Sequence, residues 1–301
     1  MSTPIQTFQF PGLQTEQILH IKREDMIHPV ISGNKFWKLK YNLIKAKDLG
    51  KQILVTFGGA MSNHIVACAA AAQANGFQSI GIIRGEEIVE KWKENITLTE
   101  ASEYGMKFFF VPRQEYRLKE KSKYIQNILD KIPNYYLVPE GGTNTLAVKG
   151  ASEILSEETY NYDIITSAMG TGGTLAGLSV GAKAYQLVIG FPVLKNAHFL
   201  VKELLKYTHK KNFIVNLEYH FGGYAKITTE LIDFINEFYY LNNIPLDPVY
   251  TGKMMFGLRD MIKKGQIDKD KKILAVHTGG LQGIKEMNKY LSKKSKPIIV
   301  T

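Results

Sequence analysis

The chain has 301 residues, of which 45% are hydrophobic, so it can bury one large core or two moderate ones, and two domains are expected at this length. Its net charge of +10 comes mainly from lysines scattered over expected helices and the C-terminal tail, without the arginine forks and interleaved aromatic residues of nucleic-acid readers. We therefore expect a solvated basic surface that attracts anionic substrates, and no nucleic-acid partner.

Neither a membrane span nor a disulfide is expected. No apolar run reaches 18 residues, and the start at Met1 lacks the basic and apolar regions of a secretory signal. Cys68 is the single cysteine, so no internal disulfide can form, and its alanine-rich surroundings favour a small buried side chain over a reactive thiol. These features predict a cytoplasmic protein without a membrane partner.

Strands and helices alternate along the whole chain, which predicts an α/β protein. Expected strands cover residues 52–55, 79–83, 107–111, 136–138, 164–167 and 273–277. Expected helices between them include residues 34–50, 65–75 and 149–156. No internal repeat or low-complexity segment interrupts this order.

The first segment with chemical potential is Ser32-Gly33-Asn34-Lys35, where a tight Gly-Asn turn offers one amine at a fixed point. An amine is nucleophilic only when it is unprotonated, and burial or neighbouring positive charge lowers the pKa of a lysine toward neutrality. Lys35 could therefore form a Schiff base with a carbonyl group. A solvated lysine in a surface turn is the alternative, and other segments must decide between the two.

A second segment reads as a strand, a glycine-rich turn and a helix over residues 53–74. Gly58 and Gly59 allow a ligand to approach the backbone, while Ser62, Asn63 and His64 place three polar side chains where the helix begins. Ser and Asn are also the preferred N-cap residues of helices, so a purely structural role for this pair stays open.

A glycine-rich loop with the sequence GTGGT follows the apolar residues 164–165 and opens a helix. Its residues are Gly170, Thr171, Gly172, Gly173 and Thr174. Such a loop aims free N–H groups and the positive end of the helix dipole at one place, and two threonine hydroxyls can add hydrogen bonds. An anion-binding loop is therefore expected.

The GTGGT loop fits a single phosphate better than a dinucleotide. The dinucleotide fingerprint needs an acidic residue about 20 positions further on to bind the ribose. No Asp or Glu lies between positions 163 and 203, and the lysine-terminated P-loop pattern is also missing.

The last segment, residues 273–280, is a buried-looking strand that ends in His277, Thr278 and two glycines. Open α/β sheets bind their ligands at the carboxyl ends of strands. On these residues alone, simple capping of the strand by His277 and Thr278 is the favoured interpretation.

Six motifs in this order resemble the pyridoxal-phosphate enzymes of the tryptophan synthase β-like fold, and within them the 1-aminocyclopropane-1-carboxylate deaminase and D-cysteine desulfhydrase family. The resemblance covers about residues 21–283. The motifs are GNK at 33–35, GGxxSNH at 58–64, PEGG at 139–142, GTGGT at 170–174, DPVYTGK at 247–253 and HTGG at 277–280.

The resemblance implies a two-domain fold of type II, with open, twisted, mostly parallel sheets and helices on both faces. Residues 1–45 and 163–301 would form a large cofactor-binding domain, and residues 46–162 a small inserted domain, with pyridoxal 5'-phosphate in the cleft between them. A homodimer is also implied. The segment 178–219 is shorter than the family leads us to expect, so its effect on the large domain is left open.

The resemblance also assigns roles to the site residues. Lys35 would hold the cofactor covalently, Asn63 would bind its ring hydroxyl, Gly170 to Thr174 its phosphate, and Thr278 would face its pyridine nitrogen. A threonine hydroxyl is a weaker partner for that nitrogen than a carboxylate, which favours elimination over transamination. The substrate would meet side chains from two parts of the chain: Ser62, Asn63, His64, Tyr224 and Tyr250.

Thr251 bears on which family member this is. In the cyclopropane-opening enzymes a glutamate follows the second tyrosine, whereas desulfhydrase-like members commonly show the YTGK found here. The sequence therefore favours α,β-elimination from D-cysteine, with catalysis by Lys35, Ser62, Tyr224 and Tyr250. Alternatives are a 1-aminocyclopropane-1-carboxylate deaminase, a serine or threonine deaminase of the same broad fold, and a relative that binds the cofactor without catalysis.

Overall fold

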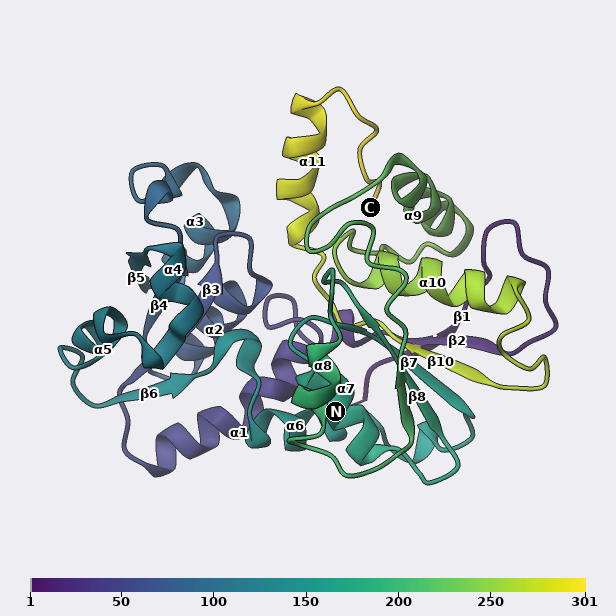
Figure 1. Ribbon diagram of the computed structural model, residues 1–301, viewed down its shortest axis with the longest axis horizontal. Coiled ribbons are helices and arrows are strands. Elements are labelled where there is room, and N and C mark those ends of the chain that lie inside the picture. The colour runs from purple at the N-terminus through teal and green to yellow at the C-terminus, as the bar shows by residue number, and fades with distance from the viewer. Residues whose placement is uncertain (1) are drawn as a thin grey trace.

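The computed structural model describes residues 2–301, which form two separate β-sheets surrounded by helices (Figure 1). The larger sheet has the strand order β1-β2-β10-β7-β8-β9, and only the pairing of β1 with β2 is antiparallel. Its strands are β1 (Ile5–Thr7), β2 (Leu19–Lys22), β7 (Ile164–Met169), β8 (Leu187–Pro192), β9 (Phe213–Val215) and β10 (Ile273–Val276).

Helices cover both faces of the larger sheet, because successive residues of its central strands point to opposite sides. Ile164 of β7 belongs to a hydrophobic cluster with α9 (Thr229–Asn242), α10 (Thr251–Lys263) and α11 (Gly283–Lys293). Its neighbour Ile165 belongs to a second cluster on the other face. That cluster includes residues of α1 (Asn34–Asp48), α6 (Thr145–Ser152), α7 (Gly173–Gly181) and α8 (Phe199–Leu204).

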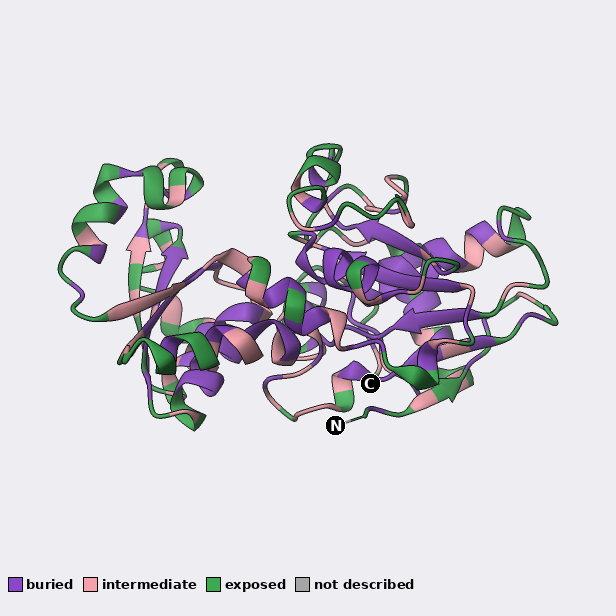
Figure 2. Cartoon of the chain, turned by 90° about the horizontal axis from the view of Figure 1, so that it is seen from below, coloured by how far each residue is buried: buried purple, intermediate pink, exposed green. Residues whose placement is uncertain are grey.

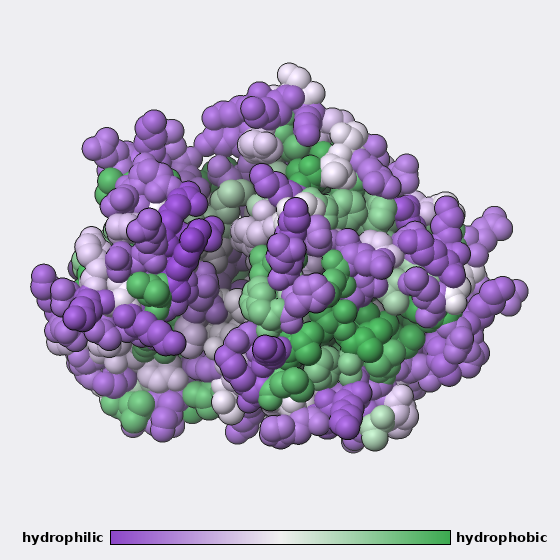
Figure 3. All heavy atoms as spheres, viewed as in Figure 1, coloured by the Kyte–Doolittle hydropathy of each residue, from purple (hydrophilic) through white to green (hydrophobic). Residues whose placement is uncertain are grey.

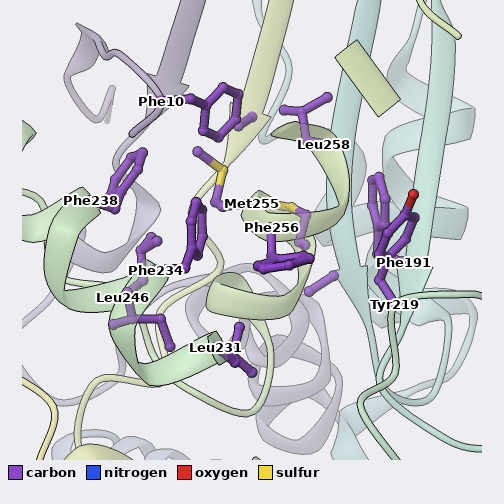
Figure 4. Close-up of a cluster of buried hydrophobic side chains, with 14 of the residues drawn as sticks. Phe10, Phe191, Tyr219, Leu231, Phe234, Phe238, Leu246, Met255, Phe256 and Leu258 are labelled. Carbon is purple, nitrogen blue, oxygen red and sulfur yellow. The ribbon is translucent and has the colours of Figure 1, made fainter. Parts of the chain in front are cut away.

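Two-sided burial explains the continuous apolar character of the central strands β7, β8 and β10. All residues of β7 and β10 are buried, and in Figure 2 the strands of the larger sheet are mostly coloured as buried. The first cluster is rich in aromatic side chains from helices α9 and α10 and from the N-terminal segment (Figure 4). Phe238, for example, is fully buried and its ring lies 6.2 Å from that of Phe10.

The smaller sheet has the order β5-β4-β3-β6, and all its pairings are parallel. Its strands are β3 (Ile53–Gly59), β4 (Gln78–Arg84), β5 (Met106–Val111) and β6 (Tyr135–Val138). One face packs on α2 (Asn63–Ala74) and α3 (Ile96–Glu103), and the other on α4 (Arg113–Leu118) and α5 (Lys123–Leu129).

The expected fold class is confirmed: the protein is α/β, its sheets are mostly parallel, and helices lie on both faces of each. The four strands of the smaller sheet lie between Ile53 and Val138, inside the expected inserted segment. The exact domain boundaries near residues 45 and 162 stay a prediction. Within residues 2–301 no helix is both long and apolar enough to cross a membrane.

The sequence prediction missed four strands and misplaced one helix. β1, β2, β8 and β9 were not predicted, and β8 and β9 show that the segment 178–219 extends the larger sheet. The helix predicted at 149–156 is α6, which begins four residues earlier because the Asn144 side chain caps it by accepting a hydrogen bond from the Ala147 amide at 2.8 Å.

Candidate active site

A cleft of about 660 Å³ lies where the carboxyl ends of the parallel strands of both sheets meet. Every site residue predicted from the sequence lines it except Gly173. The predicted residues on its wall are Lys35, Ser62, Asn63, His64, Gly170, Thr171, Gly172, Thr174, Tyr224, Tyr250 and Thr278.

Lys35 is in the first turn of α1, directly after a turn that only glycine can form. Gly33 has a φ of +63°, and a Cβ there would lie 2.0 Å from the carbonyl oxygen of Thr278. The Asn34 amide donates to that same carbonyl at 3.2 Å. The turn therefore packs directly on the loop that follows β10, which fixes the place where Lys35 enters the cleft.

Burial lowers the pKa of Lys35 to about 8, although the negative charge of Asp247 opposes the shift. Its Nζ donates a 2.9 Å hydrogen bond to Oδ1 of Asn34. The nucleophilic, unprotonated amine is consequently accessible near neutral pH, as a Schiff-base lysine requires.

Lys38 is a second buried lysine in the cleft, and the sequence analysis did not identify it. Its Nζ donates to the carbonyl of Gly141 and, at 2.8 Å, to the hydroxyl of Thr143. Burial lowers its pKa well below the ordinary value, and the charge of Lys35 lowers it further. The available signal was its position three residues after Lys35, which places both side chains on one face of a helix.

Ser62 stands at the N-cap of α2, but its side chain makes no capping hydrogen bond. The adjacent Asn63 has a buried Oδ1 without a hydrogen-bond partner in residues 2–301. Buried polar atoms are rarely left unpaired in folded proteins, so this oxygen is suited to a ligand. The structural alternative for the Ser-Asn pair is thus wrong for the Ser62 side chain.

His64 is neutral and offers a free acceptor. Its Nε2 lies 2.8 Å from the Thr56 hydroxyl, which already donates to the carbonyl of Val138, so we assign the proton to Nε2. Nδ1 then carries a lone pair and is buried without a partner in the described chain. Burial, together with Lys35 and Lys38, lowers the pKa of this histidine well below its usual value.

The GTGGT loop leads into α7, whose first-turn amides have no acceptor within the helix. Gly172 has a φ of +85°, and a Cβ there would meet Leu204 at an ordinary 3.5 Å. Gly173 is the crowded position, because its Cβ would lie 2.7 Å from the Thr143 hydroxyl. That hydroxyl also pairs with the one on Thr171 at 2.6 Å, which links the loop to Lys38.

The two predicted tyrosines face each other, with ring centroids 6.1 Å apart and planes at 72°. Burial raises the pKa of both phenols, and their mutual interaction raises that of Tyr250 further while partly opposing the rise at Tyr224. Both are therefore protonated hydroxyl groups at neutral pH. Tyr250 also lies against the GTGGT loop, since a Cβ on Gly170 would be 3.3 Å from its ring.

Thr278 lines the cleft, whereas its neighbour His277 is a structural residue. His277 is fully buried, and its Nε2 lies 2.7 Å from the carbonyl of Pro245. The Gly279 backbone N–H also donates to His277 Nδ1 at 3.2 Å, so the contacts of His277 are structural, while Thr278 lines the cleft.

Thr251, the residue used to choose between family members, does not line the cleft. Thr251 is fully buried at the start of α10. Its hydroxyl donates to Oδ1 of Asp247 at 2.8 Å and accepts from the backbone N–H of Asp247 at 2.9 Å. Arg84 and Glu140 also line the cleft but were not predicted as site residues. Nothing in the local sequence separates Arg84 from a surface charge, and Glu140 stands in the PEGG motif, to which no role was assigned.

Two relatives of this chain are similar to it over most of its length. A provisionally named 1-aminocyclopropane-1-carboxylate deaminase of Pyrococcus horikoshii is 31% identical over 93% of this chain and 90% of its own length. A mitochondrial bifunctional D-cysteine desulfhydrase/1-aminocyclopropane-1-carboxylate deaminase of Arabidopsis thaliana is 31% identical over 94% of this chain and 77% of its own.

Solved structures agree with these relatives. The crystal structure of a homologue of 1-aminocyclopropane-1-carboxylate deaminase superposes with a TM-score of 0.78 at 30% identity, covering 97% of this chain and 94% of that one. A hydrogen sulfide-producing enzyme from Fusobacterium nucleatum shares the fold, with a TM-score of 0.64 at 13% identity over 92% of this chain and 94% of that one.

The residues of the cleft fit pyridoxal phosphate. An amine with a lowered pKa suits an aldehyde, the start of α7 beside Lys38 suits a phosphate, and the unpaired oxygen of Asn63 suits a hydroxyl donor. The family described as pyridoxal-phosphate dependent enzymes matches residues 2–279. This chain therefore belongs to the pyridoxal-phosphate dependent enzymes of fold type II, within the group of 1-aminocyclopropane-1-carboxylate deaminases and D-cysteine desulfhydrases.

Proposed function

We propose that this enzyme is a lyase that eliminates the β-substituent of D-cysteine, giving pyruvate, ammonia and sulfide. The observation that carries the proposal is the absence of a carboxylate from α10 in the cleft. Thr251 occupies the position where the family resemblance implies a glutamate in the ring-opening enzymes, and its hydroxyl donates a hydrogen bond to Asp247. Among the described residues that line the cleft, the only carboxylates are those of Glu87 and Glu140.

When bound, the cofactor would supply an electron sink that acidifies the Cα proton of the substrate. Lys35 would hold the resting cofactor, with Lys38, the amides at the start of α7 and the hydroxyls of Thr171 and Thr174 around its phosphate. Asn63 and Thr278 would contact its ring. Support comes from the unpaired Asn63 oxygen and from the place of each group on the cleft wall.

Lys35 would be the carrier for the Cα proton. Its pKa of about 8 allows it to accept a proton and return it at neutral pH. Ser62, whose hydroxyl is not used for capping, would bind the substrate carboxylate together with the amides at the start of α2.

Tyr224 and Tyr250 would protonate the leaving sulfur. The raised pKa of each phenol keeps its proton in place until a stronger base, such as a developing thiolate, approaches. His64 Nδ1, which can only accept, would receive a hydrogen bond from a donor group of the substrate.

The second candidate is opening of 1-aminocyclopropane-1-carboxylate to 2-oxobutyrate and ammonia. The free hydroxyl of Ser62 favours it, since that side chain would be placed to help attack the ring. The Arabidopsis relative carries both activities in its name, so the two reactions are compatible with one scaffold.

A substrate panel tests the proposal. Purified holoenzyme is incubated with D-cysteine, L-cysteine, D-serine and 1-aminocyclopropane-1-carboxylate, and pyruvate, 2-oxobutyrate and sulfide are measured separately. We expect equal amounts of sulfide and pyruvate from D-cysteine. Formation of 2-oxobutyrate together with no reaction of D-cysteine would establish the second candidate instead, and turnover of D-serine alone would indicate a hydroxyamino-acid deaminase.

We also propose that the enzyme is a homodimer. Apolar side chains gather on the surface around α8 in the view of Figure 3, and Phe199, Leu205 and Ile214 are 51%, 49% and 44% exposed. Contiguous exposed apolar surface of this kind is typical of protein interfaces, and a second copy of the chain is the partner that the family resemblance implies.

A further inference from the structure

Lys253 is a buried lysine for which the reaction described above has no use. It lies in the first turn of α10, where the helix dipole disfavours positive charge, and its side chain has no exposed surface. Burial lowers its pKa to about 8, while Asp247 opposes this shift. An amine in such a place is tolerated only if the protein provides hydrogen-bond acceptors for it.

The acceptors are two backbone carbonyls of one short turn. Nζ of Lys253 donates to the carbonyl of His220 at 3.0 Å and to that of Gly223 at 2.8 Å. The same turn carries Tyr224 as its next residue. Lys253 thus connects the start of α10 to the backbone that presents one of the two cleft tyrosines.

The turn needs such support because its backbone is strained. Phe221 and Ala225 have φ values of 52° and 55°, in a region that residues with a Cβ rarely adopt, and Gly222 and Gly223 between them also have positive φ. One aromatic contact also joins the turn to α10: the ring centroids of Phe221 and Phe256 lie 5.0 Å apart. The only side chain that binds its carbonyls within residues 2–301 is that of Lys253.

We propose that Lys253 is a positioning residue that holds Tyr224 against Tyr250 for proton transfer. The start of α10 would then place both phenols. Asp247 accepts the backbone N–H of Tyr250 at 2.8 Å, and Lys253 binds the turn that leads into Tyr224. This inference rests on the proposed function, in which the two phenols protonate the leaving group.

A matched pair of variants tests the inference. Methionine and glutamine have similar lengths, but only glutamine can donate to the two carbonyls. Lys253→Met should lower kcat at least about tenfold with KM and cofactor content little changed, and Lys253→Gln should recover part of the loss. Lys263→Met, at an exposed position near the other end of α10, is the control and should leave kcat unchanged.

A double-mutant cycle shows whether Lys253 acts through Tyr224. If it does, Tyr224→Phe with Lys253→Met should be no slower than the slower single variant, because both changes remove the same contribution. A second readout needs no substrate: trypsin should cut the apo-protein after the exposed Lys226 faster in Lys253→Met than in the wild type or in Tyr224→Phe.

Wild-type kcat in Lys253→Met, or losses that multiply in the double variant, would overturn the inference. If Lys253→Met does not fold, Lys253→Gln takes its place: a lowered kcat that Tyr224→Phe does not lower further would support the inference, and wild-type kcat with wild-type trypsin cleavage would overturn it. Failure of D-cysteine as a substrate would overturn only the proposed function, since the cycle can be run on whichever amino acid is turned over.

Discussion

Lys35 and Lys38 lie one helical turn apart in α1, and burial lowers the pKa of both amines. Their surroundings nevertheless separate their roles. Within residues 2–301 the Lys35 amine donates a hydrogen bond only to the side chain of Asn34, whereas the Lys38 amine donates to Gly141 and Thr143 beside the GTGGT loop. We therefore expect covalent chemistry from Lys35 and binding of an anion from Lys38.

Lys35→Ala should abolish turnover and leave the fold intact, because the role of this lysine is chemical and water can fill the space that it leaves. Borohydride reduction of the wild-type holoenzyme, followed by peptide mass spectrometry, should find the cofactor on the peptide containing Lys35. Lys45→Ala, at an exposed position of the same helix, is the control and should behave like the wild type. Label on any other lysine would refute the assignment.

The pH dependence of cofactor loading follows from the lowered pKa of Lys35. Only the neutral amine attacks an aldehyde, and with a pKa of about 8 its neutral fraction falls about tenfold for each pH unit below that value. The rate at which apo-protein takes up pyridoxal phosphate, followed by visible absorbance, should therefore rise up to about pH 8 and then level off. A rate that still rises toward pH 10 would mean that the pKa of the Lys35 amine is not lowered.

At this scale the sequence predicted residues that lie in continuous motifs and missed those that act through distant contacts. Lys35, Ser62 and Asn63 stand in short motifs whose residue types indicate the chemistry of the site. In the sequence, Lys38 cannot be told from an ordinary helix lysine. Its role depends on a contact with Thr143, which is more than a hundred residues away along the chain. Thr251 stands in a motif but faces Asp247 instead of the cleft, and sequence spacing cannot show such an orientation.

At the scale of elements, the GTGGT loop and the start of α7 form a conformational unit that depends on Gly172. Its φ of +85° is the property that matters, because a side chain there would find ordinary space beside Leu204. The neighbouring Gly173 is instead required for close packing on Thr143. The loop therefore needs its two glycines for different physical reasons.

Gly172→Val should weaken cofactor binding by about tenfold or more while changing the kcat of the remaining holoenzyme much less, since strain of about 1–3 kcal/mol would rearrange the loop. Equilibrium dialysis against pyridoxal phosphate measures the effect. Gly76→Val is the control, because Gly76 also has a positive φ, of +75°, but no cofactor-binding role. Equal cofactor affinities in the two variants would place the phosphate elsewhere.

The sequence predicted best those elements that carry a continuous apolar run or a glycine-rich turn. β9 has three residues, one of them exposed, and β1 has three with none buried, so neither shows the apolar pattern of a core strand. β8 was missed although it is mostly buried, because the segment 178–219 is shorter than the family resemblance leads us to expect. The start of α6 was placed four residues too late because the capping hydrogen bond of the Asn144 side chain was not anticipated from the sequence.

At the scale of the whole molecule, the two sheets direct the carboxyl ends of their parallel strands at one cleft. Segments 33–35, 62–64, 170–174, 224, 250 and 278 come together only through this arrangement. From the sequence, only the family resemblance indicated that these segments share one site. No single segment shows the strand order or the sheet pairing that brings them together.

The proposed homodimer gives a prediction at the same scale. Size-exclusion chromatography with light scattering should give twice the chain mass, and Leu205→Glu should shift the protein toward the monomer because a charge would be buried in the interface. Leu241→Glu, which is equally exposed but lies on α9, is the control. A wild-type monomer, or a dimer unaffected by Leu205→Glu, would contradict an interface at α8.

The most direct test of the proposed function is the ratio of kcat/KM for D-cysteine to that for 1-aminocyclopropane-1-carboxylate, measured on the same wild-type holoenzyme with Lys35→Ala as the blank. No carboxylate from α10 lines the cleft. Ring opening would need such a carboxylate as a proton carrier, whereas elimination would not. We predict that sulfide release from D-cysteine is at least about a hundredfold more efficient. Efficient formation of 2-oxobutyrate without sulfide release from D-cysteine would contradict the account.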